Sequence, residues 1–350
     1  MKMWNCTKYL LLTCFIFISN PILRAEEKPE LLPSALLYLD GFFSHHVLVA
    51  EKSTHTLHVF RNDGSYPKHI ASYQMATGKK AGDKVFQGDH RTPEGIYFLT
   101  DFISHEELLK RQGSQGEIYG VGAFVLDYPN AIDEMAGKTG GGIWIHSTND
   151  ETRIEKGLDS RGCIVTANTD LIEISKYIEL NRTAVVVVQE LSFLKKEAWE
   201  QMRNGIKDSV MAWLEAWQQE DFEKYIGSYH KEFRDPTRGG LNAFSQYKKA
   251  VFANPGQPQI ELDNISILFS GRYAVVTFLQ NYTSNTIKDK GRKTLYFKRD
   301  EFYNWRIVSE QWTKSGVPET DEQVAFQPSI RFFKSNDPVQ IFNEAKKLRN

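Results

Sequence analysis

The sequence predicts a mainly β domain followed by an α+β domain. A chain of 350 residues has a length typical of two domains. From residue 47 to about residue 190, short runs of alternating apolar residues are separated by Gly, Pro and Asp, a pattern typical of a β-sandwich or barrel. After residue 192, segments with helical spacing come before long alternating runs, and this order is typical of a separate α+β unit.

The first domain, which we place at residues 46–192, is expected to consist of short strands with two helices. Alternation predicts strands over residues 47–50, 56–60, 71–76, 95–100, 123–126, 142–146 and 184–189. Leu171, Ile174 and Ile178 recur at helical spacing and predict a helix over residues 168–180. A second helix is expected over residues 104–112.

The second domain, which we place at residues 195–315, is expected to begin with helices and to end in an antiparallel sheet. Apolar residues at helical spacing predict helices over residues 195–220 and 220–233. Alternation predicts strands over residues 259–269, 273–282, 293–299 and 305–312, joined by turns at residues 270–271, 288–291 and 303–304. A short helix is expected near residues 339–348, within a polar tail over residues 316–350.

The N-terminus has the pattern of an export signal. Lys2 and Lys8 accompany an apolar run over residues 9–19, which suits a signal peptide but is too short to cross a bilayer. Ala25 is a small residue at a suitable cleavage point. We therefore expect removal of residues 1–25 and a periplasmic mature protein without a membrane span, with an uncleaved membrane anchor as the alternative.

Charge and apolar content bear on the partners of the chain. The formal net charge of −1 gives no electrostatic reason to expect binding to nucleic acid.

Residues 26–45 precede the first domain and are rich in Leu and Phe. These side chains could pack on the body of the protein or on a second subunit, and we favour the second arrangement, a homodimer.

The cysteines indicate a reactive site. Cys6 and Cys14 lie in the expected signal peptide, which leaves Cys163 as the single thiol of an exported chain, either inert or reactive. His146 ends an apolar strand, and an imidazole near Cys163 could take the thiol proton and leave an ion pair. Gly162 would allow a tight turn with backbone N–H groups that could hold an oxyanion. Spacing alone does not decide whether Cys163 and His146 are catalytic, because a single His and a single Cys are more often core residues.

The sequence around these residues resembles the signature of the L,D-transpeptidases, whose catalytic domain is called YkuD. The resemblance covers about residues 45–190 and rests on the following segments: Thr77-Gly78-Lys79, Gly88-Asp89, residues 91–97, residues 137–140, His146-Ser147-Thr148 and Ser160-Arg161-Gly162-Cys163. It implies a β-sandwich in which Cys163 is the nucleophile, His146 is its base and the Ser147 carbonyl orients the imidazole. The chain departs from the common pattern at Arg161, where many members have His, and at Val165, where many have Arg or Asn.

The second half is similar to NTF2-like domains, in which helices precede a curved antiparallel sheet. This similarity rests on residues 213–217, Tyr225 and the strand over residues 305–312. The pair of domains resembles the L,D-carboxypeptidases that trim peptidoglycan stem peptides and set cell shape. It implies removal of the terminal D-alanine from a tetrapeptide stem, with a thioester on Cys163 resolved by water. An amine acceptor would instead make the protein a transpeptidase that forms 3-3 crosslinks or anchors protein to the wall, and the domain pairing alone favours water.

Five further residues are candidates for contact with the stem peptide. They lie next to the Cys or on the segments around the His strand: Ser160, Arg161, Trp144, Tyr128 and Lys138. No cofactor or metal is expected. The segment Gly137-Lys138-Thr139 resembles the end of a phosphate-binding loop, but Ile132 stands where that loop needs its first glycine.

Two other classes of protein stay open. A sortase-like protein transpeptidase also uses Cys and His on a β scaffold, but it needs an Arg downstream of the Cys, whereas Arg161 precedes Cys163. A non-catalytic wall-binding scaffold, in which the second domain carries the function, is the third class.

Overall fold

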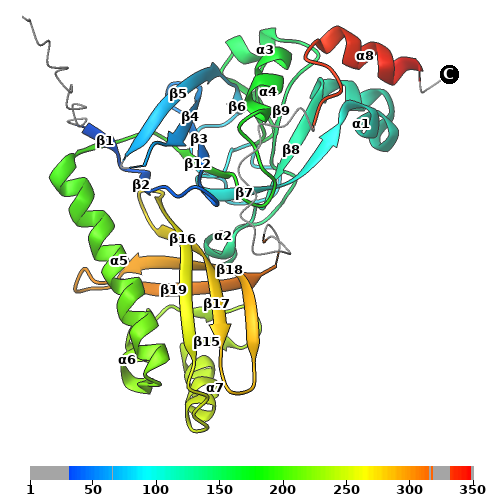
Figure 1. Ribbon diagram of the computed structural model, residues 1–350. Helices are drawn as coiled ribbons and strands as arrows, with labels where there is room; N and C mark the ends of the chain where they lie inside the picture. Colours follow the sequence, from blue (N-terminus) through cyan, green and yellow to red (C-terminus); the bar gives the residue numbers. More distant parts are fainter. Residues whose placement is uncertain (1–30, 65, 315–316, 318–331, 348–350) are drawn as a thin grey trace, which may run out of the picture.

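The computed structural model describes residues 31–64, 66–314, 317 and 332–347. Figure 1 shows two units stacked along the long axis, with a mixed sheet in the upper unit and an antiparallel sheet in the lower one. The expected signal peptide lies outside the described residues. Within the described part of the chain, no helix combines the length and the apolar character needed to cross a bilayer.

The upper unit is built on an eight-stranded sheet of order β11-β9-β8-β7-β12-β3-β4-β5. Its strands in chain order are β3 (His46–Glu51), β4 (Thr56–Asn62), β5 (Pro67–Gln74), β7 (Gly95–Ser104), β8 (Gly122–Leu126), β9 (Trp144–His146), β11 (Ile164–Val165) and β12 (Ala184–Val188). Strand β12 runs parallel to β3 and antiparallel to β7, which explains its continuous run of buried valines. A small parallel pair, β6 (Thr77–Gly78) with β10 (Leu158–Ser160), lies beside this sheet.

Short helices connect these strands. They are α1 (His105–Gln112), the 3-10 helix η1 (Gly113–Tyr119), α2 (Ala131–Met135), α3 (Thr152–Glu155) and α4 (Asn168–Ser175). The prediction of a helix over residues 168–180 is too long, because the chain turns after Ser175 and reaches β12 through Asn181, which has a positive φ of 63°. Leu171, Ile174 and Ile178 are buried, as their spacing predicts.

The lower unit is a five-stranded antiparallel sheet of order β19-β18-β17-β16-β2, covered by helices. The strands are β2 (Leu36–Tyr38), β16 (Gln259–Phe269), β17 (Ala274–Thr283), β18 (Lys288–Arg299) and β19 (Trp305–Thr313). The helices are α5 (Lys196–Gln218), α6 (Phe222–Gly227) and α7 (Leu241–Phe252), and the short pair β14 (Arg234–Asp235) and β15 (Gly239–Gly240) lies between the last two. The remaining elements are β1 (Leu31–Pro33), β13 (Phe193–Lys195) and α8 (Pro338–Lys347).

Two predictions for the lower unit are wrong in detail. Residues 288–291 are not a turn, because they pair with residues 280–283 of β17, and the turn lies at residues 284–287. The helix expected over residues 220–233 ends at Gly227, because the His230 N–H and the Ser228 carbonyl bond to the backbone of Ile307 in β19. Helix α7 was not predicted.

The segment before the first domain packs on the chain itself. Strand β1 pairs with β13, and β2 joins the edge of the lower sheet beside β16. Leu36, Leu37 and Phe43 are at most 1% exposed, because they lie in the cores of the two units. These apolar side chains therefore give no argument for a second subunit.

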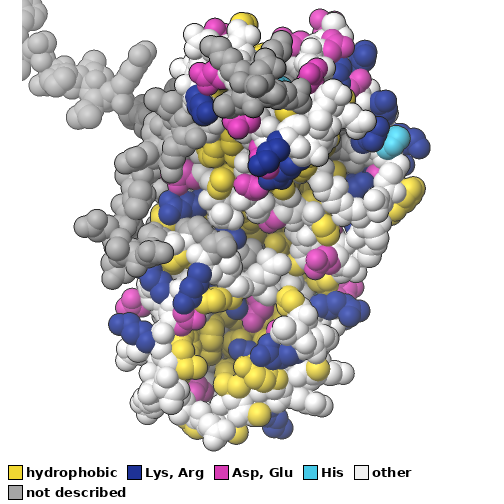
Figure 2. Space-filling model, turned by 90° about the vertical axis from the view of Figure 1, so that its right-hand side faces the viewer, with side chains coloured by type: hydrophobic (Ala, Val, Ile, Leu, Met, Phe, Trp, Pro, Cys, Tyr) yellow, Lys and Arg dark blue, Asp and Glu magenta, His cyan; other side chains and the backbone are white. Residues whose placement is uncertain are grey.

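Polar contacts join the two units, next to a buried apolar cluster to which both units contribute. The Tyr273 hydroxyl accepts hydrogen bonds from the Ile96 N–H and the Asn130 amide, each at 2.9 Å. Arg272 forms an ion pair with Asp83 at 2.9 Å and donates to the Glu94 carbonyl at 2.9 Å. In Figure 2 charged side chains of both signs are scattered over the visible face, and apolar side chains gather in the lower unit.

A buried ion pair lies inside the lower unit. The Lys293 ammonium is 3.1 Å from the Glu310 carboxylate, and both side chains are at most 10% exposed. The Tyr229 hydroxyl donates to the same carboxylate at 3.0 Å. A charge buried in this way depends on its partner, because removal of one member leaves the other uncompensated in a poorly solvated site.

We expect Lys293→Met to lower the free energy of unfolding by about 3 kcal/mol, the low end of the cost of breaking a buried ion pair, because the charge of Lys248 still acts on Glu310. Urea unfolding followed by far-UV circular dichroism measures this loss. Lys231→Met is the matched control, because Lys231 pairs with Glu301 at 3.3 Å on the surface, where both side chains are more than half exposed. An equal loss in both variants would contradict the assignment of a stabilising buried pair.

Candidate active site

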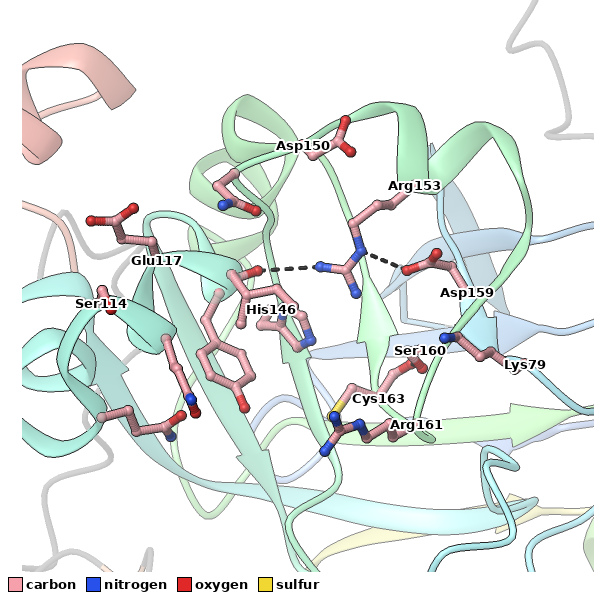
Figure 3. Close-up of a pocket in the computed structure, with 15 residues that line it drawn as sticks. Lys79, Ser114, Glu117, His146, Asp150, Arg153, Asp159, Ser160, Arg161 and Cys163 are labelled. Atoms are coloured by element: carbon pink, nitrogen blue, oxygen red, sulfur yellow. Dashed lines mark hydrogen bonds and ion pairs between the residues drawn. The ribbon is translucent and has the colours of Figure 1, made fainter.

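A polar cavity of about 740 Å³ opens on the upper unit between η1, α3 and the turn before β11. Figure 3 shows the side chains that line it. They are Lys79, Gln112, Ser114, Gln115, Glu117, Ile118, Tyr119, His146, Asn149, Asp150, Arg153, Asp159, Ser160, Arg161 and Cys163. The structure thus brings His146 and Cys163, which are far apart in the sequence, into one cavity.

The pairing of β9 with β11 accounts for this proximity. The two strands are parallel, with Ile145 opposite Ile164 and His146 opposite Val165. Cys163 immediately precedes β11, so it lies beside Trp144 at the start of β9, two residues before His146. The thiol is half-buried, and its Sγ lies 3.5 Å from the Gly142 carbonyl.

The turn before Cys163 depends on Gly162 and Ser160. Gly162 has a φ of 132°, which only glycine adopts readily, and a Cβ at this position would lie 2.8 Å from the Arg91 carbonyl oxygen. The Ser160 hydroxyl donates to the Cys163 carbonyl at 2.6 Å and accepts from the Gly162 N–H at 3.0 Å. The prediction that the Gly162 N–H holds an oxyanion is therefore not supported in this structure, because that donor already has a partner.

His146 is held in one orientation. Its Nδ1 lies 2.5 Å from the Ser147 carbonyl oxygen, which can only accept, so Nδ1 carries the proton. Nε2 is then unprotonated and faces the cavity on the side of Cys163 (Figure 3). The ring of Tyr119 packs edge-on against the imidazole, with 4.9 Å between the ring centroids.

The orientation of Ser147 depends on the segment after η1. The Ser147 hydroxyl accepts a hydrogen bond from the Val121 N–H at 2.8 Å. Gly120 has a φ of 56°, and a Cβ there would collide with the Ser147 hydroxyl and the Asn168 amide oxygen. Glycine is therefore required where this segment passes over the backbone that orients His146.

Arg153 brings a positive charge into the cavity. Its Nε pairs with Asp159 at 2.5 Å, and its Nη1 donates to the Thr148 hydroxyl at 3.1 Å and to the Ile118 carbonyl at 3.3 Å. Figure 3 shows the remaining nitrogen, Nη2, directed towards His146 and Cys163. Among the described residues this nitrogen has no hydrogen-bond partner, so it is available to a ligand.

Burial keeps the thiol and the imidazole neutral at physiological pH. Desolvation raises the pKa of Cys163 to about 11, against a smaller opposite effect of the Trp144 N–H and the Arg153 charge. Desolvation also lowers the pKa of His146 to about 4, and the Ser147 carbonyl only partly offsets this. A resting thiolate–imidazolium ion pair, which the sequence left open, is therefore disfavoured.

The other substrate-contact candidates lie in different places. Ser160 and Arg161 line the cavity, whereas Trp144, Tyr128 and Lys138 do not. Trp144 stacks on Tyr119 at 5.0 Å, and the buried Tyr128 donates to the Thr139 carbonyl at 3.3 Å. Lys138 forms ion pairs with Asp83 and Asp133, both at 2.8 Å, so its charge is neutralised away from the cavity.

Sequence reasoning missed Arg153 and Asp159. Both lie in the short segment between His146 and Cys163, which forms one wall of the cavity. Their position between the two candidate residues was the signal that could have identified them. In residues 31–64, 66–314, 317 and 332–347, no three His, Cys, Asp or Glu side chains are grouped as a metal site requires.

Comparison with known proteins identifies the two units. Residues 45–187 match the L,D-transpeptidase catalytic domain, YkuD, and residues 205–311 match the Cds6 C-terminal NTF2-like domain. No curated protein sequence matches the chain. The fold class predicted from the sequence, a sheet-rich domain followed by an NTF2-like domain, is confirmed.

Solved structures share both units. The structure of Bd1075 from Bdellovibrio bacteriovorus is 29% identical with a TM-score of 0.70, over 84% of this chain and 100% of that one. The helical cell shape determining protein Pgp2 from Campylobacter jejuni is 26% identical with a TM-score of 0.64, over 80% of this chain and 95% of that one. The similarity therefore extends across the catalytic unit and the NTF2-like unit together.

The neutral thiol leads to a test of reactivity against pH. For residues 26–350, in which Cys163 is the single thiol, we expect the rate of iodoacetamide alkylation to keep rising above pH 9, because the pKa of the thiol is raised to about 11. Arg153→Gln should raise the pH midpoint of alkylation further, because the positive charge of Arg153 stabilises the thiolate and the variant lacks this charge. A midpoint below pH 7 would contradict a neutral resting pair.

Proposed function

We propose that this chain, which joins an L,D-transpeptidase catalytic domain to an NTF2-like domain, is an exported cysteine L,D-carboxypeptidase. Its substrate would be the tetrapeptide stem of peptidoglycan, from which it removes the terminal D-alanine and leaves a tripeptide. The observation that carries the proposal is the His146–Cys163 pair in a polar cavity of the catalytic unit. The Pgp2 structure is described as that of a helical cell shape determining protein, which supports a cell-envelope location and a role in cell shape.

The first half of the reaction follows from the neutral pair. Cys163 Sγ attacks the carbonyl carbon of the third stem residue while His146 Nε2 takes the thiol proton. The bond between this carbon and the D-alanine nitrogen then breaks, and Nε2 returns the proton to the departing amine. The products of this half are free D-alanine and a thioester on Cys163.

The second half releases the tripeptide. Water attacks the thioester carbonyl, Nε2 accepts a proton from the water, and the C–S bond breaks. The proton then passes from Nε2 to the sulfur, which restores the neutral thiol. The Ser147 carbonyl keeps the proton on Nδ1 throughout, because its hydrogen bond stabilises the imidazolium that forms in both halves.

Arg153 supports recognition of a free C-terminus. The carboxylate of the terminal D-alanine is one carbon away from the nitrogen that leaves, so it must lie close to the dyad. Arg153 Nη2 points into this region from α3, and a guanidinium binds a carboxylate through charge-assisted hydrogen bonds. We assign to Arg153 the binding of this carboxylate, in a chain that has Val165 where many L,D-transpeptidases have Arg or Asn.

The second candidate function is transpeptidation. Both reactions pass through the same thioester, and they differ in whether water or an amine of a neighbouring stem resolves it. The pairing with an NTF2-like domain favours hydrolysis, whereas the large cavity leaves room for an acceptor peptide. Product analysis separates the two reactions.

Digestion of purified muropeptides by residues 26–350 under reducing conditions, followed by mass spectrometry, tests the function. We expect tripeptide stems and free D-alanine, and no activity for Cys163→Ala. Accumulation of 3-3 crosslinked dimers would establish the transpeptidase instead. Unchanged muropeptides with the wild-type protein would overturn both enzymatic functions and favour a non-catalytic wall-binding scaffold.

Arg153→Gln tests the recognition of the terminal carboxylate. We expect kcat/KM on a tetrapeptide to fall by roughly 10- to 100-fold, the usual worth of a hydrogen bond to a charged group. On a tetrapeptide with an amidated C-terminus, wild type and variant should differ little, because the partner of Arg153 is already absent. Lys156→Gln is the matched control, since Lys156 also faces Asp159, at 3.7 Å, but is more than half exposed. Equal losses on both substrates would contradict the assignment of Arg153 to the terminal carboxylate.

A further inference from the structure

We propose that the C-terminal segment, Phe332–Phe333 with helix α8 (Pro338–Lys347), is a positioning element of the catalytic cavity: it packs on His105 of α1 and thereby fixes the backbone that orients His146. Only the kinetic part of its test rests on the proposed function. The structural part concerns the order of residues 113–121 and does not require a known substrate.

The segment belongs to the core of the catalytic unit, although it follows the NTF2-like unit in sequence. The Phe332 ring packs on Phe102 at 5.1 Å and on Phe124 at 5.0 Å, and the Phe333 ring packs on Phe102 at 5.1 Å. Phe333 is 6% exposed and lies in the same cluster as Ile145, next to His146. Figure 1 shows α8 beside α1 at the end of the upper unit that is remote from the lower one.

The contact between α8 and α1 includes an aromatic pair. The Phe342 ring packs edge-on against the His105 ring, with 4.9 Å between centroids and 77° between planes. His105 is the first residue of α1 and is only 5% exposed. Its Nδ1 donates to the Gly120 carbonyl at 2.6 Å, so one side chain joins the start of α1 to the residue after η1. The position of Gly120 therefore depends on the position of the His105 ring.

Gly120 lies between the two residues that fix the imidazole. Tyr119 packs on the His146 ring, and the Val121 N–H donates to the hydroxyl of Ser147. The Ser147 carbonyl in turn accepts from His146 Nδ1. A displacement of Gly120 thus changes both the packing and the hydrogen bond that hold His146.

The η1 segment needs this external support. A 3-10 helix has poor hydrogen-bond geometry and is rarely stable beyond three or four residues, whereas η1 has seven. Of these seven residues only Gly116 is buried, and Tyr119 is partly buried against the cluster of Ile103, Leu108 and Ala123, so the segment contributes little to a core. It nevertheless supplies the cavity wall through Ser114, Gln115 and Glu117. In our proposal, the packing of α8 on α1 keeps η1 ordered through the contact of His105 with Gly120.

The test compares two substitutions on the same helix. Phe342→Ala removes the ring that packs on His105, whereas Val339→Ala changes a side chain that is 62% exposed. We expect Phe342→Ala to lower kcat by about tenfold or more, since a small misplacement of a catalytic group has effects of this size. Hydrogen exchange of residues 113–121 should become faster in this variant. Val339→Ala should match the wild type in both measurements.

A second pair of variants separates positioning from general destabilisation. His105→Asn keeps a donor at the place of Nδ1, and His105→Leu keeps the bulk but loses the donor. We expect His105→Asn to retain more kcat than His105→Leu at similar thermal stability. Phe342→Tyr should restore both kcat and the exchange protection.

Two results would overturn the proposal. One is a rate of hydrogen exchange for residues 113–121 that equals the wild-type rate in both Phe342→Ala and His105→Leu, whatever the activity of these variants. The other is equal kcat in His105→Asn and His105→Leu together with faster exchange throughout the chain, which would indicate loss of stability alone. If the wild-type protein proves inactive on muropeptides, the exchange measurements still decide the structural claim.

Discussion

The hydrogen bond between His146 Nδ1 and the Ser147 carbonyl is the contact on which the site depends. It determines which ring nitrogen carries the proton, and so leaves Nε2 free to accept the proton of Cys163. The parallel pairing of β9 with β11 then brings the two side chains together. Gly120 and Gly162 are required because the backbone passes too close for a side chain at both places.

The electrostatics of the cavity suit a reaction that starts from neutral groups. Burial raises the pKa of Cys163 and lowers that of His146, so neither of these two groups carries a charge at rest. In the proposed reaction, charge on the pair develops only during attack, when the Ser147 carbonyl stabilises the imidazolium. Arg153, paired with Asp159, supplies a fixed positive charge, and in the proposed reaction this charge binds the substrate carboxylate close to the reacting atoms.

Sequence patterns predicted the parts of this structure that local chemistry determines. The alternating runs located the strands of both units, and the motif around Cys163 singled out two residues, His146 and Cys163, that line one cavity. The partners of Lys138, Tyr128 and the Gly162 N–H could not be predicted from the sequence, because Asp83, Thr139 and Ser160 are brought to them by tertiary packing. Arg153 and the docking of α8 on α1 were missed for the same reason, since neither follows a local period. Strand β2 likewise joins a sheet whose other strands lie more than two hundred residues later.

The most direct measurement is nitrogen-15 NMR of the imidazole of His146 at neutral pH in the uncomplexed protein. A neutral ring with its proton on Nδ1 and an unprotonated Nε2 is the result that we expect. Protonation of both nitrogens at pH 7, accompanied by a thiolate at Cys163, would contradict the neutral dyad. A proton on Nε2 alone would contradict the role of the Ser147 carbonyl, and with it the mechanism by which His146 activates Cys163.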